Sequence, residues 1–486
     1  MSLRQQAVHG VKWQFVEILG RQLIGFVVFT WLTRLLDPTS FGLMGLISVY
    51  IAFAAMLAEQ GIATALVQRR DLAPEHLNAA FWLTVALAVG LAALTVLVAP
   101  GLALLFHEPQ LTSLLRWASP LLVLNALPII QGSLLTRTFA FRTLALRTLL
   151  ANVFGGAIGL VLARYGFGPW ALVIQQLTAS LVSALVMWFS EPWRPAFRFS
   201  LTHLRDLLSV SGSVFAVTFL WFLSSRFEQF VIGRGNGVAT LGYYTTGGKL
   251  PDMAKTAIYQ PLNAIALPLL ARLQQDASRT CSALYTAMSL NAVVAFAVYI
   301  GLASIAQDVV PLLFGEQWGP SAPLLQLLAI YGLCQGLNAY SHPALVAQGV
   351  GREYVTVQVI HATGVVLLSL ATVSLGLLWM LAALSANMLF ATFLCSRLLQ
   401  RRIGLSLLRY FGACVAPAVA AAAMFAVTQL ITHSDILQRS WLKVSIEIIS
   451  GAVTYLSVVT LLSPHLLRQL WTTIVAARSD SRAVTG

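Results

Sequence analysis

Long apolar segments, separated by short polar ones, follow one another along the whole chain. The clearest is Ala79 to Phe106, which has 28 residues and no charged residue. A bilayer has a hydrocarbon core of about 30 Å, and a helix of about 20 apolar residues crosses it. Because the segments are continuously apolar and do not alternate, they indicate helices and not the strands of a membrane barrel. We therefore expect an all-α, polytopic integral membrane protein.

The pattern predicts about fourteen transmembrane helices. The eighth is the weakest, because it carries Lys249, Asp252 and Lys255. Pro120 and Pro128 are candidate kinks within the fourth. The expected helices cover residues 11–34, 41–67, 79–106, 111–135, 145–164, 169–190, 210–232, 243–270, 283–306, 321–348, 354–374, 376–396, 409–431 and 443–464.

The composition leaves little room for a soluble domain. Hydrophobic residues make up 58% of the chain and charged residues 10%, and the longest internal polar segment runs from Glu191 to Val210. Domains that fold in water have at least about 50 residues. This disfavours an enzyme whose catalytic residues lie in an extramembrane domain. The first 15 residues also lack the pattern of a cleaved signal peptide, so the first helix is expected to act as an uncleaved signal.

Lysine and arginine are distributed unevenly over the connecting segments. Of the 30 in the chain, 20 lie in segments that would share one side of the membrane, Arg137 and Arg147 among them, and 5 lie on the opposite side. Positive residues collect on the cytoplasmic side, so both termini are predicted to be cytoplasmic. The same asymmetry accounts for the net charge of +13. That charge indicates contact with anionic lipids and requires no nucleic acid.

Cysteine and histidine give no sign of a metal centre. The four cysteines form no C-x-x-C pair, and no H-E-x-x-H pattern is present among the eight histidines. We expect neither a metal nor a cofactor, and we interpret the cysteines as small packing residues.

An internal repeat divides the predicted helices into two sets. Arg34 precedes Gly42 by eight residues, and Arg234 precedes Gly242 by the same interval, 200 residues later. A second similarity joins two tryptophan-containing turns 209 residues apart. Because six helices separate the copies, the halves share one orientation, which predicts two lobes with a substrate cleft between them. The expected parts are an N-terminal six-helix lobe (1–190), a cytoplasmic linker (191–209), a C-terminal six-helix lobe (210–402), and two extra helices with a cytoplasmic tail (403–486).

Several charged residues lie inside the expected helices. A charge at the centre of a lipid-facing helix costs at least about 2.5–3.5 kcal/mol, so these side chains should face a wet cavity or one another. Arginine and lysine suit a diphosphate group, and the predicted substrate-binding residues are Arg21, Arg226, Lys249 and Lys255. The predicted residues for ion coupling or charge pairing are Glu17, Glu59, Glu228 and Asp252.

Structural roles remain open for the same residues. Glu17 and Arg21, four residues apart, would form a stabilising pair on one helix face. Arg226 is two residues from Glu228, so their side chains point about 200° apart and one of them would make an interhelical pair. Lys249 and Lys255 would instead pair with the aspartate between them.

A set of short motifs resembles the polysaccharide-transport branch of the MOP exporter superfamily. The chain looks most like the Wzx-type oligosaccharide flippases near the colanic-acid exporter group, over about residues 10–350. The motifs are Thr33-Arg-Leu-Leu-Asp-Pro38, Phe41-Gly-Leu-Met-Gly45, Ala65-Leu-Val-Gln-Arg69, Phe141-Arg-Thr-Leu-Ala-Leu-Arg147, Gly168-Pro-Trp-Ala-Leu-Val173, Trp193-Arg-Pro195, Leu273-Gln-Gln-Asp276 and Phe314-Gly-Glu-Gln-Trp318.

The resemblance implies alternating access that moves undecaprenyl-diphosphate-linked oligosaccharide repeat units from the cytoplasmic to the periplasmic leaflet of the bacterial inner membrane. It implies no enzymatic activity. The partners would be the lipid-linked oligosaccharide, membrane lipids and the polysaccharide polymerase and chain-length machinery. Related peptidoglycan-lipid flippases carry functional arginines in helices one and eight. Arg21 matches the first, whereas this chain offers only lysines in helix eight.

Two other functions remain. An ion-coupled drug antiporter of the same superfamily would use the acidic residues of the expected cavity without the basic ones. A membrane-embedded glycan polymerase or ligase would carry a sizeable outer loop with catalytic residues. The expected outer loops, such as those near Phe106–Leu111 and Asp308–Pro320, are short, which favours the flippase.

Overall fold

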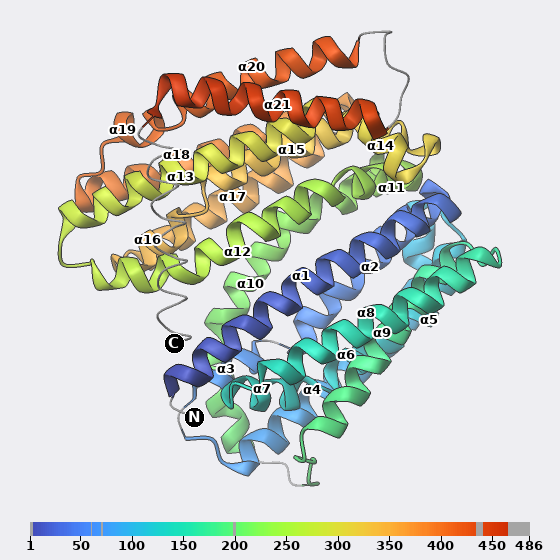
Figure 1. Cartoon of the computed structure of the whole chain (residues 1–486). Coiled ribbons are helices and arrows are strands. Elements are labelled where there is room, and N and C mark those ends of the chain that lie inside the picture. Colours follow the sequence, from blue (N-terminus) through green and yellow to red (C-terminus); the bar gives the residue numbers. More distant parts are fainter. Residues whose placement is uncertain (1–2, 60, 70, 198–200, 434–440, 465–486) are drawn as a thin grey trace. The chain divides into compact units, whose positions relative to one another are not determined.

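The computed structural model describes residues 3–59, 61–69, 71–197, 201–433 and 441–464 (Figure 1). Within these residues the secondary structure is helical, with 21 α-helices and two short 3-10 helices. The expected all-α fold is confirmed. Contacts along the chain divide it into two compact units, Met1–Thr245 and Thr246–Gly486. The division into lobes at residues 1–190, 191–209, 210–402 and 403–486 stays a prediction, and the tail from residue 465 lies outside the described residues.

The first unit contains α1 to α10 and most of α11. Their bounds are α1 (Leu3–Leu35), α2 (Pro38–Glu59), α3 (Ile62–Gln68), α4 (Pro74–Phe106), α5 (Gln110–Ala118), α6 (Pro120–Ala126), α7 (Ile129–Arg137), α8 (Phe141–Arg164), α9 (Pro169–Ser190), α10 (Leu201–Gly235) and α11 (Val238–Gly247).

The second unit contains the remaining helices. Their bounds are α12 (Lys249–Arg272), α13 (Ala277–Ser304), α14 (Ala306–Phe314), η1 (Glu316–Trp318), α15 (Ser321–Leu337), α16 (Ser341–Ala347), α17 (Gly351–Thr372), η2 (Val373–Leu375), α18 (Leu377–Ile403), α19 (Leu407–Gly412), α20 (Val415–Thr432) and α21 (Trp441–Leu462).

Twelve helical segments of the described residues are long and apolar enough to cross a membrane. They correspond to twelve of the fourteen expected helices, so a multi-pass membrane protein is confirmed. The two others, 243–270 and 321–348, are helical but are not among these twelve. The first contains α12 with its charged residues, and the second is divided into α15, of 17 residues, and α16. The count of fourteen therefore stays a prediction.

Two expected helices of the first unit are broken. The second ends as α2 at Glu59 and resumes as α3 after Gly61, whose φ of 75° is in the left-handed region that favours glycine. The fourth is divided into α5, α6 and α7. Pro120 starts α6 and Pro128 directly precedes α7, as expected of a residue that has no N–H and clashes with the preceding helical turn.

Small residues bring α8 into close contact with its neighbours α1 and α9. A Cβ on Gly156 would contact the Val28 side chain of α1, and one on Gly155 would lie 2.8 Å from the Gln175 carbonyl oxygen of α9. Helix pairs in lipid rely on such close packing, because burying apolar surface gains little there. This packing holds the inner face of α8 in a defined orientation.

The start of the expected linker is fixed to the first unit. Its residue Ala196 receives a hydrogen bond on its carbonyl oxygen from Trp82 Nε1 (2.9 Å) and donates its N–H to Asn78 Oδ1 (2.9 Å). Both partners belong to α4. Arg194 donates to the Trp188 carbonyl oxygen at the end of α9 (2.6 Å). The chain therefore leaves α9 along a defined path.

In the second unit, α13, α15 and α18 form the centre, and the α20–α21 pair packs on α13. A hydrogen bond from Tyr455 OH to the Val293 carbonyl oxygen (2.7 Å) ties α21 to α13. Gln429 of α20 donates to the Ser304 carbonyl oxygen at the end of α13 (3.0 Å). These buried polar contacts supplement the apolar cluster of Val293, Met424 and Val459 between the same helices.

Candidate functional site

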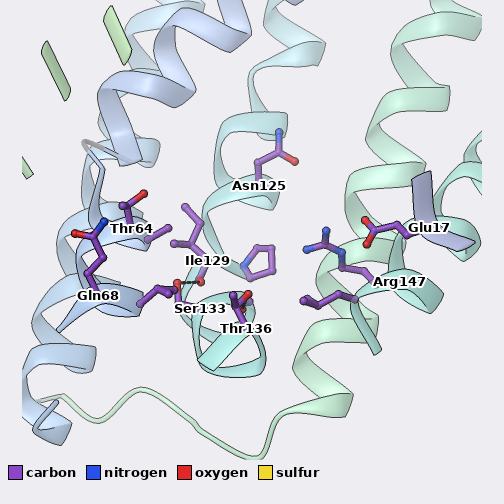
Figure 2. Close-up of a pocket in the computed structure, with 13 residues that line it drawn as sticks. Glu17, Thr64, Gln68, Asn125, Ile129, Ser133, Thr136 and Arg147 are labelled. Carbon is purple, nitrogen blue, oxygen red and sulfur yellow. Dashed lines mark hydrogen bonds between the residues drawn. The ribbon is translucent and has the colours of Figure 1, made fainter. Parts of the chain in front are cut away.

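A cavity of about 510 Å³ lies within the first unit, among α1, α3, α6, α7 and α8. It falls in the size range of small-molecule sites, about 300–1,000 Å³. Figure 2 shows polar side chains from several helices around it. The polar lining consists of Glu17, Thr64, Gln68, Asn125, Ser133, Thr136 and Arg147. Thr64, Gln68 and Asn125 are exposed, so the cavity opens to the surface.

The broken helices create this cavity. Its walls include Ala63 and Thr64, just after the Gly61 turn, and Pro128 and Ile129, at the break between α6 and α7. Gly132 of α7 also lines it. Short helices with changed directions cannot fill the space that one continuous helix would occupy. The prolines and glycine that interrupt the apolar pattern thus position the site.

Arg137 fixes the short helix that forms one wall. Its Nη1 donates to the carbonyl oxygens of Leu66 (2.8 Å), Val67 (3.3 Å) and Arg69. Carbonyl groups at the end of a helix have no partner within the helix, and a positive side chain stabilises them. Arg137, counted as cytoplasmic from the sequence, therefore caps α3 and holds the wall in place.

The charged part of the cavity lies where α1 meets α8. Figure 2 shows Arg147 of α8 reaching into the cavity with Glu17 of α1 beside it. The Thr148 hydroxyl donates to Glu17 Oε1 (2.8 Å), and Arg147 Nη2 lies 3.4 Å from the Thr148 hydroxyl oxygen. Both charged side chains are half-buried. Thr148 and Arg147 thus orient the carboxylate, while the guanidinium can still meet an anion from the cavity.

The predicted residues of the first unit do not gather at one place. Glu17 lines the cavity, whereas Arg21, one turn along α1, is exposed and is absent from the lining. Arg226 is exposed on α10. Glu228 is buried, and its Oε1 accepts a hydrogen bond from Tyr244 OH (3.3 Å). Arg226 is exposed and Glu228 is buried, as expected for two residues that are two apart on a helix and therefore point to opposite sides. Glu59, the last residue of α2, is half-buried.

The remaining predicted residues belong to the second unit. Lys249 begins α12, and Asp252 lies in the first turn of that helix. Lys249 and Lys255 are partly buried and Asp252 is exposed. Lys249 and Asp252 are close enough to attract each other electrostatically, as the pairing alternative expects. A shared cationic cavity formed by these lysines with Arg21 and Arg226 stays a prediction.

Arg147 is the functional candidate that the sequence analysis missed. It was counted among the cytoplasmic residues, although it lies within the expected fifth helix. The other missed residues are neutral polar ones, such as Asn125 and Ser133, which a search for charges passes over. A signal was available in the recurrence of Thr, Ser, Asn and Gln within otherwise apolar segments.

Possible metal ligands do not cluster in the part of the chain that the structure describes. No group of three or more His, Cys, Asp or Glu side chains there could hold a metal ion. Cys281, Cys334 and Cys395 are buried free thiols and Cys414 is a half-buried one. The polar cavity is the candidate site, because Arg147 and side chains with hydroxyl and amide groups line it.

Comparison with known proteins identifies relatives of this chain. It is 27% identical to the succinoglycan biosynthesis transport protein ExoT of Rhizobium meliloti over 320 residues, which cover 66% of this chain and 65% of that protein. It is 25% identical to the lipopolysaccharide biosynthesis protein WzxC of Escherichia coli (70% and 69% covered). It is also 25% identical to the teichuronic acid biosynthesis protein TuaB of Bacillus subtilis (94% and 95% covered). The first match thus spans slightly less than two thirds of its relative.

Solved structures share the fold. The lipid II flippase MurJ in an inward closed conformation matches with a TM-score of 0.76, at 13% identity, over 94% of this chain and all of that one. An inward-facing multidrug resistance MATE transporter of the MOP superfamily matches with a TM-score of 0.60, at 18% identity, over 79% and 94% of the two chains. At these identities the likeness concerns the fold alone.

The family match agrees with the motifs found in the sequence. The family described as "Polysaccharide biosynthesis protein" matches residues 31–323, which is more than half of the chain. The segment includes Arg147 and most residues of the cavity. The resemblance to proteins of polysaccharide biosynthesis is thereby confirmed. The chain belongs to the polysaccharide biosynthesis protein family.

Proposed function

We propose that the protein is a flippase for undecaprenyl-diphosphate-linked oligosaccharide repeat units in surface polysaccharide biosynthesis. It would carry them from the cytoplasmic to the periplasmic leaflet by alternating access. The proposal is supported by the family, by relatives named for succinoglycan transport and lipopolysaccharide biosynthesis, and by the fold shared with a lipid II flippase. These relatives and neighbours include transporters, and we propose no enzymatic activity.

The observation that carries the proposal is Arg147 in a cavity that is otherwise lined by Glu17 and by neutral polar and apolar side chains. Arginine binds phosphate oxygens through two parallel N–H groups, which suits the diphosphate of a lipid carrier. The Thr64 hydroxyl and the Asn125 amide can donate to and accept from sugar hydroxyls. The hydroxyls of Ser133 and Thr136 donate to carbonyl oxygens of their own helix turn, so they can accept from sugar hydroxyls. The opening to the surface lets the lipid tail stay outside the cavity while the head group enters.

Glu17 has a defined part in this scheme. It accepts from Thr148 and attracts Arg147 electrostatically, so it holds the guanidinium when no substrate is present. An incoming diphosphate would compete with Glu17 for Arg147, which lowers the affinity for the diphosphate and so favours its release. The predicted coupling roles of Glu59, Glu228 and Asp252 are additional proposals that rest on their charge.

We place the protein in the bacterial inner membrane, with both termini cytoplasmic. The support is the 20-to-5 distribution of lysine and arginine. Arg69 and Arg137, at the ends of α3 and α7, would then lie near the cytoplasmic end of the cavity, where the substrate is made. The polysaccharide polymerase and chain-length machinery would receive the product on the other side.

A deletion strain tests the proposal. Loss of surface polymer, with intact repeat units held on the cytoplasmic leaflet, would support the flippase. Intact units that reach the outer leaflet but stay unpolymerised would indicate a polymerase or ligase. Unchanged surface polymer in a strain without a second carrier would favour the drug antiporter.

Complementation of that strain tests the site. Losing a charge-assisted hydrogen bond of about 1.5–3 kcal/mol corresponds to roughly a 10- to 100-fold loss of affinity. We expect Arg147→Ala to reduce export on that scale at normal protein level, and Arg147→Lys to retain part of it. Arg164→Ala is the matched control, because Arg164 is exposed at the opposite end of the same helix. Full export by Arg147→Ala would exclude Arg147 from the site.

A further inference from the structure

An arginine-rich surface lies in the second unit, where α18 ends and α19 follows (Figure 1). We call its four exposed arginines the basic patch: Arg397, Arg401, Arg402 and Arg409. No Asp or Glu is present from residue 354 to residue 434, so neither α18 nor α19 carries an acid that would balance them. The basic patch belongs to a different compact unit from the polar cavity, so the proposed substrate site does not explain it.

The backbone that carries the basic patch is fixed against α13. Cys281 Sγ of α13 donates to the Ile403 carbonyl oxygen at the end of α18 (3.4 Å). Ser406 donates its N–H to the Tyr285 hydroxyl oxygen, also on α13 (2.7 Å). Leu405, between these two contacts in the sequence, is fully buried. The turn from α18 into α19 therefore presents its arginines on a defined surface.

Aromatic rings orient two of these arginines. The Arg409 guanidinium carbon lies over the Tyr285 ring, 4.7 Å from its centroid, and that of Arg397 lies over Phe393 at 6.0 Å. Arg397 Nη1 also donates to Gln400 Oε1 (2.9 Å). A ring attracts a cation but supplies no oxygen acceptor for its N–H groups. Most N–H donors of these two side chains can therefore bind a ligand.

Arginines in the first unit use their donors within the protein. Arg194, which follows α9, donates to three backbone carbonyl oxygens at 2.6 to 2.8 Å, and Arg137 caps α3. In the part of the chain that the structure describes, the side chains of Arg401 and Arg402 make no hydrogen bond and no ion pair with another residue. The positive-inside preference and the dipole of α18 favour positive charge at this end. Neither requires four guanidinium groups to lie together with open donors.

The position of the basic patch suits a lipid. α18 is long and apolar enough to cross the membrane, so its end lies near the level of the lipid phosphates. Leu408 of α19 is 88% exposed, although Tyr410, two residues later, is 1% exposed. A phospholipid would offer its phosphate to the arginines and its acyl chain to Leu408. A soluble anion has no apolar part that would contact this leucine.

We propose that the basic patch binds the head group of an anionic phospholipid through its phosphate. Arginine binds phosphate oxygens through two parallel N–H groups, and basic sites at the ends of membrane helices bind anionic lipids. In the orientation proposed above, this lipid belongs to the cytoplasmic leaflet. The bound lipid joins the ends of α18 and α19, so membrane composition affects the stability of the second unit.

A lipid titration of the purified full-length protein, read by native mass spectrometry, tests the site. We expect phosphatidylglycerol to bind the wild type more tightly than the uncharged phosphatidylcholine. Each arginine near an anionic lipid is worth about fivefold in affinity, so the double variant Arg401→Gln/Arg402→Gln should bind phosphatidylglycerol about 25-fold more weakly. Arg279→Gln is the matched control, because Arg279 is an exposed arginine of the same unit that pairs with Asp276. It should keep the wild-type affinity.

Three results of this titration would overturn the proposal. The first is equal affinity of the wild type for the two lipids, which would leave the charge a role in topology alone. The second is an unchanged affinity in the double variant. The third is displacement of phosphatidylglycerol by an equal concentration of inorganic phosphate or polyglutamate, because the basic patch would then be a site for a soluble anion or an acidic protein segment.

Melting temperatures in detergent give an independent readout, because a ligand that binds the folded state raises them. Without added lipid, the double variant should melt as the wild type does, since both arginines are exposed. Phosphatidylglycerol should then raise the melting temperature of the wild type and of Arg279→Gln, and that of the double variant much less. The same rise in all three proteins would contradict the proposal.

Discussion

At the scale of single residues, the first unit uses arginines in two different ways. Arg147 enters a polar cavity, whereas Arg137 donates to the terminal carbonyl groups of α3. Both were counted as cytoplasmic charges from the sequence, because a rule about distribution records only the side on which a residue lies. Their separate tasks depend on which helix end or cavity lies within reach of each side chain.

Removing the Arg137 guanidinium should destabilise α3. Arg137→Ala leaves buried or half-buried carbonyl groups without a donor, which costs about 1–3 kcal/mol. We expect a lower melting temperature and faster hydrogen exchange in α3. Arg116→Ala is the control, since Arg116 is exposed on α5. Equal effects of the two substitutions would contradict the capping role.

At the scale of elements, α2 and α11 touch through their backbones. A Cβ on Gly42 would overlap the carbonyl oxygen of Val238, and a Cβ on Gly242 would overlap that of Pro38. Both glycines belong to the repeated motif found in the sequence. A packing reason therefore underlies part of a pattern that was identified only by spacing.

An alanine at either glycine should force the helices apart. We expect Gly242→Ala to destabilise the protein by about 1–3 kcal/mol, the usual cost of overpacking. Gly90→Ala is the control, because Gly90 lies inside α4 with open space around its Cβ position. There alanine should be neutral or stabilising by about 0.5–1 kcal/mol. Melting temperatures of the Gly242→Ala and Gly90→Ala variants in detergent measure the two effects. A Gly242→Ala variant as stable as the wild type would show that α2 and α11 can move apart without cost.

Sequence reasoning succeeded where the signal is local and failed where it is not. Lengths and positions of helices such as α4 and α9 follow from continuous apolar segments, and Pro120 and Pro128 mark real breaks. The cavity could not be predicted in the same way. Its neutral polar side chains lie on α3, α6 and α7, and only the packing of these broken helices brings them together.

At the scale of the whole molecule, the membrane orientation follows from the sum of the charges and from no single residue. Alkaline phosphatase fused after His107, between α4 and α5, should be active because that connection is expected outside the cytoplasm. The same enzyme fused after Gly404, between α18 and α19, should be inactive, and a green fluorescent protein there should fluoresce. An inactive phosphatase after His107 and an active one after Gly404 would place the termini outside the cytoplasm and contradict the proposed direction of transport.

The two glycines of the α2–α11 crossing have a consequence for ancestry. Gly42 meets residue 238 and Gly242 meets residue 38, so the contact is reciprocal at an offset of 200 residues. This is the isologous pattern by which two identical subunits associate. A half-length ancestral chain could have formed a homodimer through this one patch before duplication and fusion. The crossing would then preserve an old subunit interface inside a single polypeptide.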